Sequence, residues 1–441
     1  MTSRRILELL RRYESRNVTF IDQDGSWPMV WDRAQGTHVW DVEGKRYLDL
    51  TAAFGVAAAG HANRRVVAAG QRQMARLLHA MGDVHPHPLK GKLARELSRI
   101  TFERWSSVQR RRQTAKTIFC NSGFEAVEAA LKTARLATGR AGVIAFTGAY
   151  HGVGYGTLNA THRDYFRSEF LDQLGKFGRF VLFPRAGDPR GPKTLKSQVQ
   201  SQLRRLMARE RIGAILVEPI QVRGGIHIPP EWFLPLLRDL CDGRRVLLIL
   251  DEIYTGFGRT GKWFACEHAG VAPDLICLGK ALTGGFPLSA CVGRSEVMDA
   301  AWPESEGEAM HTSTFLGHPV GCAMALAQIE EIRSRGLIER SAKLGPFLLE
   351  ALRTLVAHRN KTSARGLGLL AGLELRDAKG RPDTSRALHA IKTMLHRGFI
   401  LLPEGADANV ISFTPPLTIT RADLGRGLAA LAEVLHGGAG R

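Results

Sequence analysis

Six short apolar segments in the middle of the chain constrain its fold more than any other feature. They span residues 117–120, 142–146, 214–218, 246–251, 275–279 and 288–293. Several are apolar throughout rather than alternating, as expected for strands that are covered on both faces. Helical stretches lie between many of them, for example 123–138 and 231–242. This alternation predicts an α/β fold, with a large domain built on a mostly parallel central sheet.

The two ends of the chain have a different pattern. Residues 37–50 contain two short alternating runs around a Glu-Gly pair, which predicts a hairpin. From about residue 320 the sequence becomes helix-rich, and segments 369–376 and 409–420 predict a second, small sheet. We therefore expect a large domain at 71–325 and a small α+β domain formed by residues 1–70 together with 326–441.

The composition excludes several classes of protein. An apolar content of 44% and a charged content of 23% are ordinary for a folded soluble chain, and no apolar stretch is long enough to span a membrane. The net charge of +19 is spread along the chain, with dense spots only at 110–112 and 204–211. The second has the spacing of a helix with a solvated basic face. We therefore expect small anionic ligands rather than nucleic acid or a membrane.

The start of the chain and its cysteines indicate the cellular compartment. Residues 1–16 lack the apolar core of a secretion signal, and Glu8 and Glu14 argue against a mitochondrial presequence. A short amphipathic helix is predicted there instead. The six cysteines show no CxxC pair and no ligand spacing, so we expect reduced, packed thiols and no metal site. A cytoplasmic protein is the simplest interpretation.

Two charged residues follow neighbouring apolar segments, where parallel sheets collect their chemistry. Asp251 ends the segment 246–251, and Lys280 follows the segment 275–279. Taken alone, each is more often structural, as a turn acid or a surface lysine. Together they suggest more, because a desolvated lysine can form an imine and an ionised acid can keep a pyridine nitrogen protonated.

Two further elements complete a recognisable set. The strand–turn–helix sequence around Gly123 could hold a phosphate on the free N–H groups of a helix start, although an ordinary turn looks the same. Tyr150 could stack on an aromatic ring, although a single tyrosine is more often a packing residue. A lysine, an acid, a phosphate cradle and an aromatic side chain make up a site for pyridoxal 5′-phosphate.

The segments that carry these residues resemble the class III pyridoxal-phosphate aminotransferases, which include 4-aminobutyrate, ornithine and amine transaminases. The matching segments are "NSGFEAVEAALKTAR", "FTGAYHG", "VEPIQ", "LILDEIYTGFGRTG", "LGKALTGGFPLSA", "STFLGHPVGCAMA" and "FTPPLTIT". They keep the family's order from about residue 40 to 420. The resemblance implies fold type I and a ping-pong transfer from an amine or amino acid to an aldehyde or a keto acid such as pyruvate or 2-oxoglutarate. It also implies a homodimer with the site at the subunit interface, or a tetramer built from it.

The resemblance also implies a role for each matching residue. Lys280 forms the Schiff base with the cofactor and later moves the proton, Asp251 pairs with the ring nitrogen, and His151 supports Asp251. The remaining cofactor contacts are Ile253 and Tyr150 on the two ring faces, the backbone amides of Gly123 and Phe124 on the phosphate, and Thr314 from the other subunit.

The chain departs from the family at positions that recognise substrate. Relatives that act on 4-aminobutyrate or ornithine usually have arginine where this chain has Val153 and Ser412, and glutamate where it has Arg223. Valine and serine cannot replace a bidentate guanidinium. Either Arg223 takes over carboxylate recognition or it pairs with a structural acid. Loss of both arginines favours an ω-amine donor. His85 falls near a cleft-lining stretch of the relatives, but a lone histidine is more often structural.

Two alternatives use the same residues. An aminomutase or amino-acid racemase on this scaffold would need the same lysine and acid but no second substrate. A binding protein without catalysis is less favoured, because Lys280 and Asp251 are both present.

Overall fold

A seven-stranded sheet forms the centre of the computed structural model, which describes residues 1–22, 27–109, 113–357 and 362–437. The basic run at 110–112 lies outside the described residues. Only β10 runs antiparallel to its neighbours, so the predicted mostly parallel sheet is confirmed. In spatial order the strands are β4 (Ala115–Cys120), β10 (Ser289–Arg294), β9 (Leu275–Leu278), β8 (Leu247–Asp251), β7 (Ile212–Val217), β5 (Gly142–Phe146) and β6 (Gly178–Val181).

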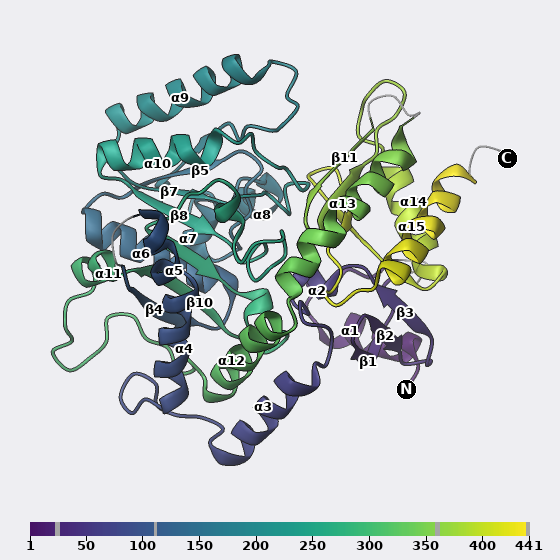
Figure 1. The fold of residues 1–441 in the computed structure, drawn as a ribbon, viewed down its shortest axis with the longest axis horizontal. Helices are drawn as coiled ribbons and strands as arrows, with labels where there is room; N and C mark the ends of the chain where they lie inside the picture. Colours follow the sequence, from purple (N-terminus) through teal and green to yellow (C-terminus); the bar gives the residue numbers. More distant parts are fainter. Residues whose placement is uncertain (23–26, 110–112, 358–361, 438–441) are drawn as a thin grey trace.

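Helices cover both faces of this sheet. In β8 the side chains of Leu248 and Leu250 belong to one core and that of Ile249 to the other, as expected for a strand buried on both sides. One face carries α6 (Gly123–Thr138) and α11 (Ser295–Ala301); the other carries α4 (Pro88–Ile100), α5 (Phe102–Gln109), α9 (Pro192–Arg209) and α10 (Phe233–Arg244). Figure 1 shows this layered body on the left and a smaller lobe on the right.

The smaller lobe contains two sheets of four strands. The first joins the two ends of the chain, because β13 (Phe399–Ile400) pairs in parallel with β3 (Arg46–Asp49). Its other members are β1 (Trp31–Gln35) and β2 (His38–Asp41), and β2 with β3 forms the predicted hairpin. The second sheet is antiparallel and confirms the small sheet predicted from segments 369–376 and 409–420. Its order is β11 (Ser363–Leu367), β12 (Leu370–Glu374), β15 (Val410–Phe413) and β14 (Leu402–Glu404).

Helices pack these sheets together. Figure 1 shows the green and yellow α13 (Leu337–Val356), α14 (Thr384–His396) and α15 (Arg421–His436) close to the purple N-terminal strands. The predicted N-terminal helix exists as α1 (Ser3–Tyr13), with Leu7 buried. The helix α3 (Arg64–Arg76) packs along α12 (Pro319–Ser334). The predicted domain boundary at 325 falls inside α12. The domain limits at 70 and 325 stay a prediction.

A buried arginine ties the lobes together. Arg259 lies in the loop after β8, and its Nη1 donates to the carbonyl oxygens of Leu369 at 3.0 Å and Pro415 at 2.5 Å. Its own carbonyl accepts from Leu369 N and from Ser341 Oγ. Burial lowers the pKa of Arg259 to about 10. The small lobe is therefore hydrogen-bonded directly to the loop that leaves β8.

Several short elements complete the fold. They are the left-handed turn α2 (Ala52–Gly55), the helices α7 (Tyr155–Leu158) and α8 (Asp164–Arg167), and the 3-10 turns η1 (Ser168–Phe170), η2 (Ala265–His268) and η3 (Lys280–Leu282). All six cysteines are free and buried, as predicted. Among the described residues, no helix is both long and apolar enough to cross a membrane. Within the same residues, no group of three or more His, Cys, Asp or Glu side chains could hold a metal ion.

Candidate active site

A cavity of about 300 Å³ lies at the carboxyl ends of the parallel strands. Five strand ends contribute to it. Gly123 follows β4, Tyr150 follows β5, Glu218 follows β7, Asp251 ends β8 and Lys280 follows β9. The parallel arrangement therefore brings the predicted lysine, acid, glycine and aromatic residue to one edge of the sheet, as expected.

Lys280 sits at a strained point of the backbone. It begins η3 with φ at +42°, in the left-handed region that non-glycine residues seldom adopt. Its Nζ lies 4.5 Å from the centre of the Tyr254 ring. Burial lowers the pKa of Lys280, although the nearby carboxylates of Asp251, Glu218 and Glu404 oppose the shift. A lysine in this setting has a larger neutral fraction, which makes Nζ a better nucleophile and base.

Asp251 is buried and fixed by two donors. Its Oδ2 accepts from His151 Nδ1 at 2.8 Å, and its Oδ1 accepts from the backbone N–H of Ile253 at 3.1 Å. Because a carboxylate can only accept, Nδ1 of His151 carries the hydrogen in this contact. The backbone N–H of His151 donates to Thr161 Oγ1 at 3.0 Å. This hydrogen bond fixes the backbone of the residue that carries the imidazole. The predicted support of Asp251 by His151 thus exists as a direct hydrogen bond.

Ile253 and Tyr150, predicted to flank a ring, both line the cavity. Ile253 lies against Gly123, where an added Cβ would come within 3.1 Å of Ile253 Cδ1. Tyr150 packs edge-on against Phe166, with ring centres 5.3 Å apart. The glycine therefore leaves room for Ile253 at the edge of the cavity.

The start of α6 has the features of an anion site. Glu125 Oε2 accepts from the backbone N–H groups of Asn121 at 2.6 Å and Ser122 at 3.1 Å, which fixes the turn. Ser122 Oγ is buried and has no hydrogen-bond partner among the described residues. The first N–H groups of a helix, here those of Gly123 and Phe124, also lack partners inside the helix. Free N–H groups and an unpartnered hydroxyl together suit a phosphate.

Glu218 lines the cavity, yet no role was predicted for it. Its Oε1 accepts from Tyr150 N at 3.0 Å and its Oε2 from Val222 N at 3.3 Å. Burial raises the pKa of Glu218 to about 7, with His151 opposing and Asp251 adding to the shift. The sequence did contain a signal for Glu218, because this residue directly follows a wholly apolar strand. Asp251 was identified from the same kind of position.

Arg223 is paired with a buried acid from the small lobe. Its Nη1 donates to Glu404 Oε2 at 3.0 Å, and its guanidinium lies 5.7 Å from the centre of the Tyr150 ring. Burial raises the pKa of Glu404 to about 7 against the effect of Arg223. The pairing that one interpretation predicted is therefore present. Arg223 nevertheless lines the cavity.

The other predicted substrate residues are dispersed. Val153 lines the cavity and is 49% exposed. Ser412 is buried in β15, and His85 is exposed between α3 and α4; neither lines the cavity. Thr314 is exposed in the segment between α11 and α12, away from the cavity of its own chain. The roles predicted for these four residues stay predictions.

The residues of the cavity fit pyridoxal 5′-phosphate. Ser122 Oγ and the start of α6 offer donors for its phosphate, and Asp251 offers a fixed carboxylate for its ring nitrogen. Lys280 offers an amine whose pKa is lowered by burial. The donors, the acceptor and the nucleophile that this cofactor needs are thus all present in or next to one cavity.

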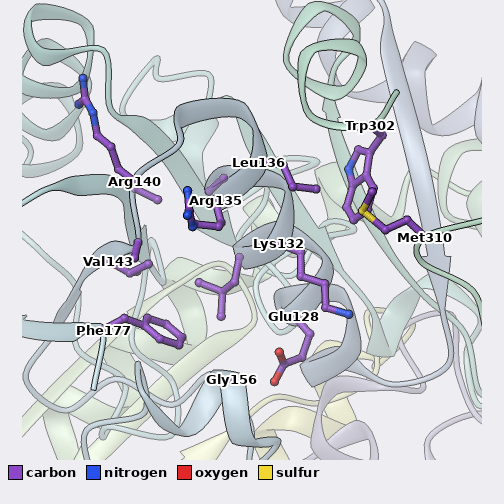
Figure 2. Close-up of a pocket in the computed structure, with 14 residues that line it drawn as sticks. Glu128, Lys132, Arg135, Leu136, Arg140, Val143, Gly156, Phe177, Trp302 and Met310 are labelled. Atoms are coloured by element: carbon purple, nitrogen blue, oxygen red, sulfur yellow. The ribbon is translucent and has the colours of Figure 1, made fainter. Parts of the chain in front are cut away.

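A second cavity, of about 510 Å³, lies on the outer side of α6 and shares no lining residue with the first. Figure 2 shows Trp302 and Met310 at one end of it and Val143 and Phe177 at the other. Glu128 faces this cavity but accepts a hydrogen bond from Thr157 N at 2.9 Å, so its carboxylate serves the fold. Its lining is mainly apolar, and its lysine and acid, Lys132 and Glu128, both belong to α6 rather than to the ends of strands.

Comparison with known proteins gives a consistent result. A family model described as class-III aminotransferase matches residues 20–435. The chain is 37% identical over 411 residues to a 5-aminovalerate aminotransferase of Pseudomonas aeruginosa, covering 92% of this chain and 93% of that protein. It is 38% identical to a putrescine aminotransferase of Pectobacterium atrosepticum, covering 93% of this chain and 83% of the relative.

Solved structures agree with these relatives. An aminotransferase of Bacillus anthracis superposes with a TM-score of 0.89 at 28% identity, covering 99% of this chain and all of that one. A PLP-bound amine transaminase from an uncultivated Pseudomonas species superposes with a TM-score of 0.86 at 30% identity, covering 97% and 99% of the two chains.

Proposed function

The chain belongs to the class III aminotransferase family and is a pyridoxal-phosphate-dependent transaminase, and we propose that Lys280 and Asp251 are its catalytic residues. One observation carries the assignment of these residues. The lysine and the acid line one cavity, and the acid is held by His151 at 2.8 Å. The named relatives are aminotransferases, so an aminomutase or racemase is not favoured.

Lys280 is proposed to bind the cofactor and to move the proton during transfer. Pyridoxal 5′-phosphate, when bound, supplies an aldehyde that links to amines and a ring that accepts the electron pair left by a departing proton. The Nζ of Lys280 takes that proton and returns it, because burial lowers its pKa and keeps more of the amine unprotonated. Asp251 holds the proton on the ring nitrogen, and His151 keeps the carboxylate in orientation.

The remaining contacts orient the cofactor. We assign Ile253 and Tyr150 to the two ring faces and the amides of Gly123 and Phe124 to the phosphate. The hydroxyl of Ser122 joins them, because it is buried without a partner among the described residues. Glu218 sets the position of Tyr150 through the backbone N–H of that residue.

We further propose a homodimer in which Thr314 of each subunit completes the phosphate site of the other. Large apolar side chains are exposed on the segments that border the two cavities, among them Phe124, Val153, Tyr155 and Met310. Such patches on a folded chain indicate a protein interface. Light scattering after gel filtration measures the mass, and Thr314→Val should weaken cofactor binding. A tetramer and a cytoplasmic location stay predictions.

The donor is proposed to be an ω-amine and the acceptor a keto acid. Val153 and Ser412 provide no positive charge, and Arg223 is the guanidinium that lines the cavity. We therefore assign carboxylate recognition to Arg223. The relatives named for 5-aminovalerate and putrescine act on compounds with a terminal amine, which supports this donor class.

A single-substrate incubation tests the proposal. With a terminal amine alone, the enzyme should release about one equivalent of carbonyl product per subunit and then stop until a keto acid is added. Continuous product formation without acceptor would instead indicate isomerisation. Lys280→Ala should abolish the release, whereas Lys262→Ala, which removes an exposed lysine outside the cavity, should not.

A further inference from the structure

The ring of Tyr254 lies directly against the amine of Lys280. Tyr254 lines the cavity and is 8% exposed, and Lys280 Nζ lies over the face of its ring, 4.5 Å from the ring centre. Within the part of the chain that the structure describes, this Nζ has no hydrogen bond and no carboxylate within ion-pair distance. The aromatic face is therefore in contact with the amine, and its π-electrons attract a cation.

Residues from both ends of the chain hold this ring in place. Thr414 Oγ1 donates to the carbonyl oxygen of Thr51 at 2.9 Å, so it accepts from the Tyr254 hydroxyl in their 3.3 Å contact. Gly55 leaves the space that the ring fills, because a Cβ at that position would come within 2.9 Å of Tyr254 Cε1. This glycine ends the left-handed turn α2, whose other three residues have φ between 48° and 62°. Such backbone strain persists only where the surrounding packing imposes it.

The phenol beside Lys280 stays uncharged. Burial raises the pKa of Tyr254, and the charge of Glu404 adds to the shift. The contact therefore joins a cation to a neutral ring. Four charged groups also act on Lys280 from neighbouring elements: the acids Asp251, Glu218 and Glu404, and the cation Arg223. All four remain when Tyr254 is replaced, so a substitution at this position isolates the effect of the ring.

We propose that Tyr254 positions the free amine of Lys280 and stabilises its protonated form during amino transfer. This inference rests on the proposed role of Lys280 in moving the proton. In that step a C–H bond of the donor breaks, its electron pair stays with the cofactor, and the proton forms a third N–H bond on Nζ. The amine becomes an ammonium at this moment, and the ring face favours that charge. A carboxylate in the same place could take the proton itself, whereas the ring cannot.

The pH dependence of cofactor capture measures the charge of Lys280. Full-length enzyme freed of cofactor captures pyridoxal 5′-phosphate covalently through its neutral amine, so the rise in visible absorbance becomes faster as Nζ loses its proton. In Tyr254→Leu, the pH of half-maximal rate should fall by about one pH unit, because the ammonium loses its aromatic contact. The titration of the free cofactor is the same for every variant and cancels in the comparison.

Three further variants separate the ring from its hydroxyl and from unrelated effects. Tyr254→Phe loses only the hydroxyl, so the midpoint should stay within about 0.3 pH units of the wild type. Tyr254→Met fills the space with a flexible apolar chain and should match Tyr254→Leu. Tyr13→Leu removes an exposed ring outside the cavity, with the Arg12 guanidinium 5.1 Å from its centre, and should leave the midpoint unchanged.

The proton-transfer step provides a second measurement. With a donor deuterated at the carbon that loses its hydrogen, Tyr254→Leu should show a kcat about threefold lower and a larger isotope effect, and Tyr254→Phe should show neither. An unchanged midpoint in both Tyr254→Leu and Tyr254→Met, or an equal fall in Tyr254→Phe, would overturn the inference alone. Covalent capture of the cofactor by Lys280→Ala would instead refute the role of Lys280 and, with it, this role of Tyr254.

Discussion

Replacing Glu404 by glutamine should change how the stability of the protein depends on pH. Glu404 is 2% exposed, and burial raises its pKa from 4.5 to about 7 in the folded chain. Between these two pH values the folded state keeps a proton that the unfolded state releases, so the stability that Glu404 contributes at low pH is lost as the pH rises. Well above pH 7, the free energy of unfolding has fallen by about 3 kcal/mol because of this group. Glutamine has nearly the same shape and does not ionise.

The magnitude follows from the two pKa values. The free energy of unfolding of Glu404→Gln, measured relative to the wild type, should rise by about 2.5 kcal/mol between pH 5 and pH 8.5. Urea unfolding of both proteins, with the cofactor removed so that its binding does not contribute, measures this difference. Glu350→Gln removes an exposed carboxylate from α13 and serves as the control for the loss of one charge.

The opposite outcome is equally informative. If the variant lost stability relative to the wild type as the pH rose, the ion pair with Arg223 would outweigh the cost of burying the carboxylate. The buried acid would then be held ionised by its partner, and the reasoning from burial would be refuted.

Four further predictions concern the site and the core. Borohydride treatment should attach the cofactor covalently to the wild type but not to Lys280→Ala; a mass increase in the variant would exclude Lys280 as the attachment point. His151→Ala should lower kcat at least about tenfold, because the buried carboxylate of Asp251 loses a hydrogen bond, and an unchanged kcat measured at saturating substrate would contradict this role. Gly123→Ala places a methyl group 3.1 Å from Ile253 Cδ1, so a fluorescence titration should show about tenfold weaker cofactor binding and a nearly unchanged melting temperature. A thiol reagent should label none of the six buried cysteines in the native protein and all six in denaturant; rapid native labelling would show that a core segment opens.

Elements with a strong periodic pattern were predictable from the sequence. The strand at 142–146 and the helix at 123–138 have the predicted bounds, because one is apolar throughout and the other combines a helical period with a glycine at its end. In contrast, β6 was missed. It has four residues at the edge of the sheet, and its Gly178 and Arg179 interrupt any apolar run.

The same distinction holds for the site. The positions of Lys280 and Asp251 at one cavity were predictable, because each residue lies at the end of an apolar strand and the parallel sheet places such strand ends at one edge. Glu404 could not be found in this way, because it ends a three-residue strand that contains a proline and lies 181 residues from Arg223. The packing of the two lobes brings that acid to Arg223, which lines the cavity.

The burial of Arg259 limits how this protein can be recombined with its relatives. Its guanidinium donates to two carbonyl oxygens of the small lobe, those of residues 369 and 415, which lie on separate segments of the chain. A chimera that took its C-terminal third from another chain would keep Arg259. The imported segment would then have to place both carbonyl oxygens within hydrogen-bond distance of this arginine. Crossover points that leave residues 259, 369 and 415 on the same parent should therefore give more soluble hybrids than those that separate them.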